Sequence, residues 1–147
     1  MIRHAWTVIC NRLVVDKESN NLSLDVLEQI EIELGAPAPD AKVKLFPIEL
    51  RIVSLWYRDG AVAEGASAYA DFVDPNGQPL GRFEFTIELE KERHRTIGQL
   101  PAVPYTVDGT YRVIVRLRAG DELMEVAQVP LAIALRIVPV AKPLAGS

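Results

Sequence analysis

Residues 108–132 read DGTYRVIVRLRAGDELMEVAQVPLA, and this stretch has the pattern of two β-strands joined by a tight turn. Apolar and charged residues alternate in its first half with the period of two that is typical of a strand with one buried face. The alternating apolar residues are Tyr111, Val113, Val115 and Leu117. Gly120-Asp121 fits a two-residue type II′ turn, because glycine adopts the positive φ required at the first central position. The sequence therefore predicts an antiparallel hairpin.

The predicted turn also sets the register of this hairpin. It places Leu117 opposite Met124 and Val115 opposite Val126 on the buried face, and Arg116 opposite Glu125 on the solvent face. Opposite charges directly across a ladder stabilise the pairing by about 0.2–1 kcal/mol, so the charges agree with this register. Proline has no N–H to donate, so we expect regular pairing to stop at Pro130 or to move to an edge there.

Most of the remaining chain also reads as strands. The predicted strands are 3–10 with a continuation over 12–15, 43–58 with a kink at Phe46-Pro47, 65–73, 80–90, 96–100 and 131–138. Residues 22–34 are ambiguous, and we favour a strand with a bulge over a short helix because apolar residues alternate in the second half. Asp74-Pro75-Asn76-Gly77 is a strong turn signal. The charged residues 91–95 are expected to connect two strands.

These segments predict an all-β protein. Short strands separated by turn clusters favour a single antiparallel β-sandwich of seven to nine strands over residues 1–140, with a small β-barrel as the alternative. Residues 141–147 are expected to form a flexible tail. The chain of 147 residues is long enough for one domain with a substantial core.

The composition excludes several classes of protein. A net charge of −4 and a pI near 5.2 disfavour binding to nucleic acid or to an anionic membrane. No uninterrupted apolar segment reaches the length of a membrane span, and the amino terminus lacks the pattern of a signal peptide. We therefore expect a cytoplasmic protein. The single cysteine, Cys10, rules out an intrachain disulfide.

The sequence DGTYRV at residues 108–113 resembles the tyrosine corner of immunoglobulin-like sandwiches, in which a tyrosine hydroxyl bonds back to the preceding corner. Val113 stands where the disulfide-linked members of that class have a cysteine, so the disulfide variety is excluded. The layout as a whole is similar to small bacterial proteins of the domain-of-unknown-function type. That resemblance implies an immunoglobulin-like or C2-like sandwich, and it implies no activity.

Few residues suggest catalysis or metal binding. Cys10 lies in an apolar strand beside Trp6 and Val8, where a free cysteine is usually an inert core residue. His4 is expected on the same side of that strand as Trp6, and His94 in a solvated loop. Asp16, Glu18 and Asn20 begin like a calcium loop, but Asn21 and Leu27 replace the required glycine and glutamate. No nucleotide-binding, hydrolase or zinc motif is found, so we expect no enzyme activity, no cofactor and no metal site.

One surface has the geometry of an interaction site. Arg112, Arg116 and Arg118 project from one strand face, and their guanidinium groups could bind carboxylates or phosphates, although pairing with Glu125 and neighbouring acids explains them more simply. Of Trp56 and Tyr57, one ring is expected in the core and the other at an interaction surface. We therefore expect an intracellular protein-interaction module that binds a protein partner or a second copy of itself, with a small-ligand or regulatory domain as the alternative.

Overall fold

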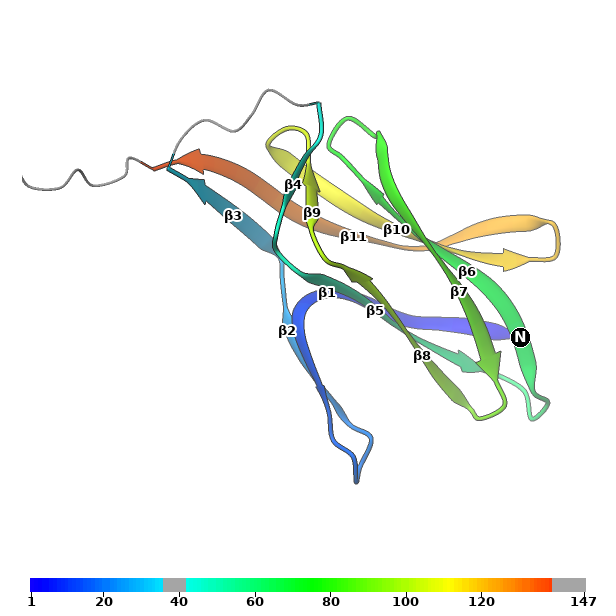
Figure 1. The fold of residues 1–147 in the computed structure, drawn as a ribbon. Coiled ribbons are helices and arrows are strands. Elements are labelled where there is room, and N and C mark those ends of the chain that lie inside the picture. The colour runs from blue at the N-terminus through cyan, green and yellow to red at the C-terminus, as the bar shows by residue number, and fades with distance from the viewer. Residues whose placement is uncertain (36–41, 139–147) are drawn as a thin grey trace, which may run out of the picture.

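The computed structural model describes residues 1–35 and 42–138, and every regular element in this part of the chain is a β-strand (Figure 1). The strands are β1 Ile2–Val15, β2 Leu22–Val26, β3 Gln29–Leu34, β4 Lys44–Phe46, β5 Leu50–Arg58, β6 Glu64–Val73, β7 Pro79–Leu89, β8 Arg93–Leu100, β9 Val103–Tyr105, β10 Gly109–Ala119 and β11 Glu122–Ile137. The all-β prediction is confirmed. None of the described residues form a helix of the kind that crosses a membrane.

Two larger sheets share one hydrophobic core. Sheet A has the order β2-β1-β5-β8, sheet B has the order β3-β11-β10-β6-β7, and β4 and β9 form a short ladder of their own. Trp56 of sheet A and Phe72 and Tyr111 of sheet B are among the largest fully buried side chains, so both sheets contribute to the core. The expected all-antiparallel arrangement is wrong in one place, because β3 pairs with β11 in parallel. Sheet B is therefore mixed.

The hairpin at residues 108–132 is present, with one correction to its register. Gly120 has a φ of 65° and the ladder closes at Ala119 and Glu122, as a two-residue turn with glycine first requires. Arg116 faces Glu125 and Leu117 faces Met124, as predicted. A bulge between Val115 and Arg116 then places Val115 opposite Ala127 instead of Val126. Met124 is 46% exposed, contrary to expectation, while Leu117 is buried.

Regular pairing does not stop at Pro130, and β11 continues through it with Arg112 opposite. The second expected outcome, an edge position, is the one found. The N–H of Ala132 points away from β10, since it donates to the carbonyl of Glu28. Pro130 stands two residues before Ala132, and alternate residues of a strand direct their backbone groups to the same side, so its nitrogen also faces away from β10. Strand β3 pairs with β11 only from Ala132 onward. The proline therefore lies where that edge of β11 has no neighbouring strand, and no ladder bond is lost.

Two segments predicted as single strands are each divided between sheets. Residues 22–34 form β2 in sheet A and β3 in sheet B, so the strand interpretation was right and the single bulge was wrong. Residues 43–58 form β4 and β5, and the kink expected at Pro47 is a complete break. Residues 93–95, expected in a connection, begin β8. These breaks raise the strand number above the seven to nine predicted.

Tyr111 anchors the corner that precedes β10. Its hydroxyl donates to the carbonyl oxygen of Val107 at 2.7 Å and accepts from the N–H groups of Thr106 at 2.8 Å and Val107 at 3.2 Å. The ring is fully buried and stacks on Phe72 at a centroid distance of 5.6 Å. The back-bonding hydroxyl expected from DGTYRV is thus present.

The turn at residues 74–77 packs against this corner. Asp74 accepts bonds from the N–H groups of Asn76 and Gln78 through one oxygen and from the Thr106 hydroxyl through the other. Burial raises the pKa of Asp74, but these three bonds outweigh it and the net pKa is lowered. Gly109 has a φ of 147°, and a Cβ there would meet Pro75 at 2.8 Å. Only glycine fits both conditions.

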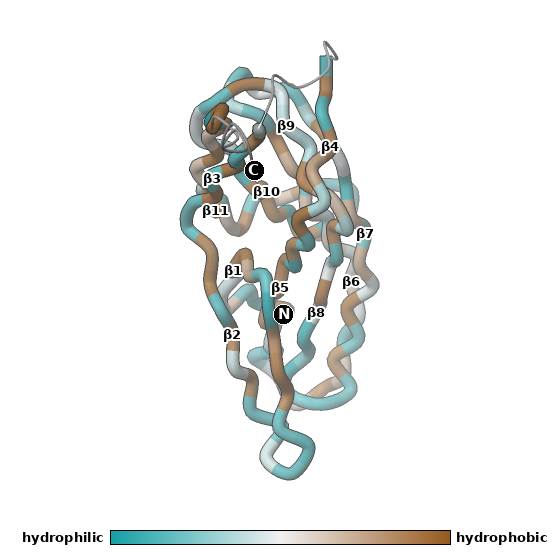
Figure 2. The backbone as a smooth tube through the Cα atoms, turned by 60° about the vertical axis from the view of Figure 1, so that its left-hand side comes forward, coloured by the Kyte–Doolittle hydropathy of each residue, from teal (hydrophilic) through white to brown (hydrophobic). Residues whose placement is uncertain are grey.

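Two bulges in β1 change which way its side chains face. The first, between His4 and Trp6, leaves His4 opposite Trp56 on the core side and Trp6 opposite Leu55 on the outer side. The expectation that His4 and Trp6 lie on the same side of the strand is therefore wrong. Past the second bulge, which follows Cys10, β1 pairs only with β2. Residues 11–26 thus form a two-stranded arm that projects beyond the two sheets (Figures 1 and 2).

The tail predicted at residues 141–147 lies outside the described residues.

Candidate functional site

The outer face of sheet B carries the arginines that were predicted as an interaction surface. Tyr111, Val113, Val115 and Leu117 of β10 are buried between the sheets, so the alternate residues face outward. The structure therefore brings Arg112, Arg116 and Arg118 together on one face, as their spacing indicated.

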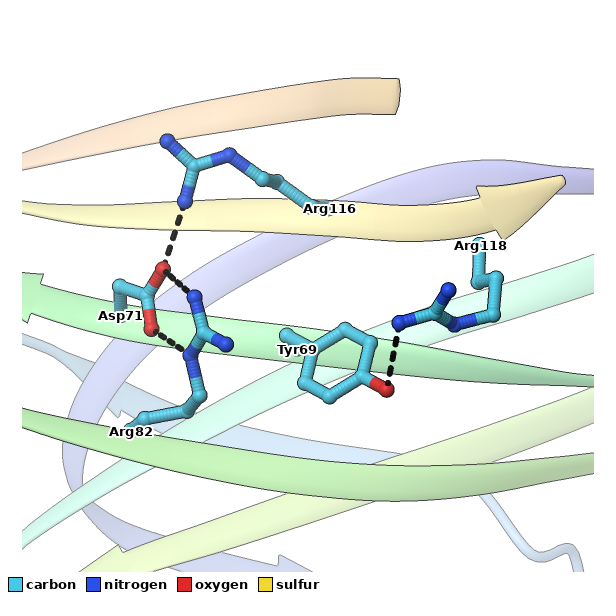
Figure 3. Close-up of polar contacts among 5 residues, drawn as sticks. All are labelled: Tyr69, Asp71, Arg82, Arg116 and Arg118. Carbon is cyan, nitrogen blue, oxygen red and sulfur yellow. Dashed lines mark hydrogen bonds and ion pairs between the residues drawn. The ribbon is translucent and has the colours of Figure 1, made fainter. Parts of the chain in front are cut away.

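Arg116 is held by Asp71 and not by Glu125. Asp71 of β6 is only 6% exposed, and its carboxylate accepts bonds from Arg116 Nη1 at 2.6 Å and from Arg82 Nε and Nη2 at 2.6 and 3.0 Å (Figure 3). Glu125 lies directly opposite Arg116 but accepts from Gln128 instead. The more buried carboxylate has less competition from water, so it attracts the guanidinium more strongly. The expected pairing with Glu125 is therefore replaced by a pairing across the other side of β10.

Tyr69 continues this cluster along β6. The guanidinium carbons of Arg82 and Arg118 lie 5.1 and 5.5 Å from the centre of its ring, and Arg118 Nη2 donates to its hydroxyl at 3.2 Å (Figure 3). Cation–π contacts of this kind stabilise an exposed pair by about 0.5–1 kcal/mol. Tyr69 and Asp71 therefore hold three arginine side chains in fixed positions, although the arginines themselves remain partly exposed.

A shallow groove of about 570 Å³ lies beside the cluster, between β10 and β7. Ile114 and Val73 are apolar lining residues, and Arg82, Arg112 and Arg116 bring the positive charge. Asp71 is the single acidic residue of the lining, so the groove carries a net charge of about +2. Arg112 makes one hydrogen bond of 3.2 Å, from Nη1 to Gln128, on this exposed rim. The groove thus joins an apolar lining to a surplus of guanidinium groups, an arrangement suited to carboxylates.

The two other residues predicted for a surface, Trp56 and Tyr57, point to opposite faces of β5, as expected of neighbours on a strand. Trp56 is fully buried and donates from Nε1 to the Thr96 hydroxyl at 3.0 Å, so it belongs to the core and not to any surface. Tyr57 is 38% exposed and lies in β5 of sheet A, whereas the arginine groove lies on sheet B.

The reactive residues do not form a catalytic set. His4 and His94 flank Trp56 in register on the core side of sheet A, whereas Cys10 faces the outer side with Arg51 opposite. His4 Nε2 lies 2.7 Å from the Thr7 hydroxyl, which lies 2.7 Å from the Ser54 hydroxyl. Burial lowers the pKa of His4 and raises the pKa of Cys10, so the imidazole and the thiol are both neutral near pH 7.

Metal binding has no obvious place in the described part of the chain. No group of three or more His, Cys, Asp or Glu side chains there is arranged to hold an ion. The loop at residues 16–21 is a hairpin turn in which Asp16 accepts from the N–H of Glu18 at 2.9 Å and Asn20 has a φ of 60°.

Sequence reasoning missed Asp71, Arg82 and Tyr69. All three stand at positions that the period-two alternation within their strands directs outward, and the sequence contains no other signal for them. Their meeting depends on Asp71 standing opposite Arg82, a register that the turn at 74–77 does not set, because a bulge lies between Phe72 and Val73.

Comparison with known proteins gives information on the fold alone. No protein-family model matches the chain, and no curated protein matches it. Among solved structures, a glycosyl hydrolase family 2 member from Bacteroides cellulosilyticus is similar over 61% of this chain with a TM-score of 0.51. The identity is 19%, and the match spans 14% of the hydrolase chain. At this identity the likeness concerns the β-rich fold of one part of a longer protein.

Proposed function

We propose that this chain is a non-enzymatic β-sandwich module of the immunoglobulin-like type that binds a protein partner through the arginine groove. The immunoglobulin-like assignment is supported by the two sheets that share one core, by the back-bonding Tyr111 hydroxyl and by the likeness to part of a family 2 glycosyl hydrolase. A cytoplasmic location belongs to the same proposal.

The arginine groove is the observation that carries the binding proposal. Its three guanidinium groups exceed its one carboxylate, and two of them are oriented by Asp71 before any ligand arrives. Orientation in advance reduces the side-chain entropy lost on binding. Guanidinium groups bind carboxylates in bidentate geometry, and the apolar lining can contact the aliphatic part of an acidic side chain. The preferred partner is therefore a protein segment rich in glutamate or aspartate.

Calorimetric titration with poly-L-glutamate tests this proposal. We expect binding at low ionic strength that weakens as salt is added. Arg112→Gln should weaken it about 10–150-fold, because a charge-assisted hydrogen bond contributes about 1.5–3 kcal/mol. The matched control is Arg136→Gln, which removes an exposed arginine paired with Glu31 elsewhere on sheet B. Equal weakening by both variants would show non-specific attraction, and no binding at low salt would overturn the proposal.

A second candidate function rests on an open pocket of about 730 Å³ at the end of the molecule where the 119–122 turn lies. Its apolar lining includes Ile2, Leu117 and Val126, and His4 and Arg118 add polar groups. This volume lies within the range of about 300–1,000 Å³ typical of small-ligand sites. A thermal-shift screen of metabolites and lipids addresses it, since a ligand of this pocket should raise the melting temperature of the native chain and not of Met124→Arg, a change at a lining residue that is 46% exposed. No shift with any compound would exclude the carrier function.

A further inference from the structure

The arm formed by residues 11–26 has one apolar side that the rest of the molecule leaves partly uncovered. Leu13, Leu22 and Leu24 of this side are half-buried, and Val15 and Val26 are 38% and 53% exposed. Arg12, Asp25 and Ser23 face the opposite, polar side. A two-stranded ribbon is marginally stable by itself in water, so an apolar side of this kind calls for an additional strand or surface.

Strand β2 is a free edge of sheet A, and it lacks the features that usually protect such an edge. Its sequence LSLDV contains no proline, lysine or arginine. The other free edges of the two large sheets, in contrast, carry proline or charged residues of this protective kind. Strand β7 begins with Pro79 and has Glu84 and Glu88 facing outward, β8 carries Arg93 and Arg95, and β3 carries Glu31 and Glu33. Within the described residues, β2 is therefore the edge best suited to accept another strand.

The hydrogen bonds of the arm show which groups of β2 are available. The carbonyl of Asn21 accepts from Asp16 and the N–H of Leu27 donates to Ile9, so both of these odd-numbered residues bond toward β1. In an antiparallel ladder, bonding toward a given neighbour alternates along the strand. The N–H and C=O groups of Leu22, Leu24 and Val26 therefore point outward, toward the free edge.

We propose that two copies of this chain associate by antiparallel pairing of their β2 edges, with Leu24 facing Leu24 of the partner subunit across a two-fold axis. The four strands of sheet A would then continue into the four of the partner. Leu22 would face Val26 of the partner subunit, and all three outward-pointing residues would lie in hydrogen-bonded pairs. The apolar sides of the two arms would form one continuous surface.

Charge complementarity selects this register. The one charged residue of β2, Asp25, faces Ser23 of the partner subunit, whose hydroxyl can donate to the carboxylate. If the register shifted by one pairing step toward the C-terminal end of β2, Asp25 would lie opposite Asp25 of the partner subunit. Like charges directly opposite each other are destabilising. A shift in the other direction would leave Val26 outside the ladder. The proposed register is the one that uses all five residues without opposing charges.

Size-exclusion chromatography with light scattering gives the first test. The expected mass is twice the chain mass of 16.3 kDa, and Leu24→Lys should reduce it to the mass of one chain. The matched control is Val14→Lys, which places the same charge on an exposed residue of the same arm, in β1 opposite Ser23. This control should remain dimeric. A monomeric wild-type chain, or equal dissociation of both variants, would overturn the proposal.

Cysteine cross-linking tests the register independently of affinity. Residues in a hydrogen-bonded antiparallel pair have Cα atoms about 5.5 Å apart, which lies within the range for a disulfide. Leu24→Cys should therefore form a covalent dimer under mild oxidation, whereas Leu22→Cys and Val14→Cys should not. The native Cys10 is fully buried and should not interfere. Cross-linking by Val14→Cys without cross-linking by Leu24→Cys would assign the contact to the β1 edge and overturn the β2 pairing.

Discussion

Removing the Tyr111 hydroxyl should destabilise the whole fold, because this one oxygen satisfies three backbone groups of the corner before β10. In Tyr111→Phe the carbonyl of Val107 and the N–H groups of Thr106 and Val107 lose their partner. The ring is fully buried, so water cannot replace the hydroxyl without disturbing the stack on Phe72. A hydrogen bond contributes about 0.5–1.5 kcal/mol net, and three of them give a loss of roughly 1.5–4.5 kcal/mol.

Urea unfolding followed by tryptophan fluorescence measures this loss. Trp56 is fully buried in the native core, so its emission should change on unfolding. The midpoint should fall while the slope with denaturant stays constant, since the surface exposed on unfolding is unchanged. In a chain of this length the melting temperature should fall by roughly 3–18 °C. Tyr57→Phe is the control, and this change at a 38% exposed ring should cost less than about 0.5 kcal/mol. A loss below 0.5 kcal/mol for Tyr111→Phe would refute the role assigned to the corner.

Three further predictions concern neighbouring parts of sheet B. Gly109→Ala should cost roughly 1–3 kcal/mol in urea unfolding because of its positive φ and the contact with Pro75, whereas Gly81→Ala, with open space around its Cβ, should be nearly neutral. Asp71→Ala should cost about 1–2 kcal/mol, a figure reduced from that of a fully buried ion pair because both arginines are partly exposed; no loss would show that the pairs contribute nothing. The bonds from Tyr105 and the Leu135 N–H lower the pKa of Asp108, so it stabilises the fold above its unfolded pKa near 3.8 and that stability is lost as the pH falls through the lower folded value. Asp108→Asn should therefore flatten the acid limb of a stability-against-pH curve, and an unchanged limb would contradict this assignment.

The local pattern of the sequence was sufficient to predict the strands but not their partners. The alternation in 108–119 and the Gly120-Asp121 turn predicted the hairpin and two of its pairs correctly. The pairing failed beyond Arg116, because a bulge adds one residue without changing the composition of the strand. Residues 22–34 and 43–58 were divided between sheets for a similar reason, since a change of sheet depends on long-range packing that a period-two pattern does not contain.

The candidate site was predictable to the same degree. The three arginines of β10 follow from alternation within one strand, so their common face could be derived. Asp71 comes from another strand and meets Arg116 and Arg82 together only after two registers are fixed, one with β10 and one with β7. The sequence left open whether Pro130 ends the pairing or lies at an edge, because the outcome depends on whether a strand lies beside it, and β3 does not reach that far.

The burial of Cys10 makes the thiol a natural probe of how often the arm separates from the body. This residue is the last of β1 to pair with both β2 and β5, and its exposed fraction is 0%. A thiol reagent can reach it only when this junction opens, so the labelling rate under native conditions reports the frequency of that local opening. If opening is limited to the arm, labelling should be much faster than global unfolding. Slowing of the reaction at higher protein concentration would then tie the motion of the arm to association of the chain.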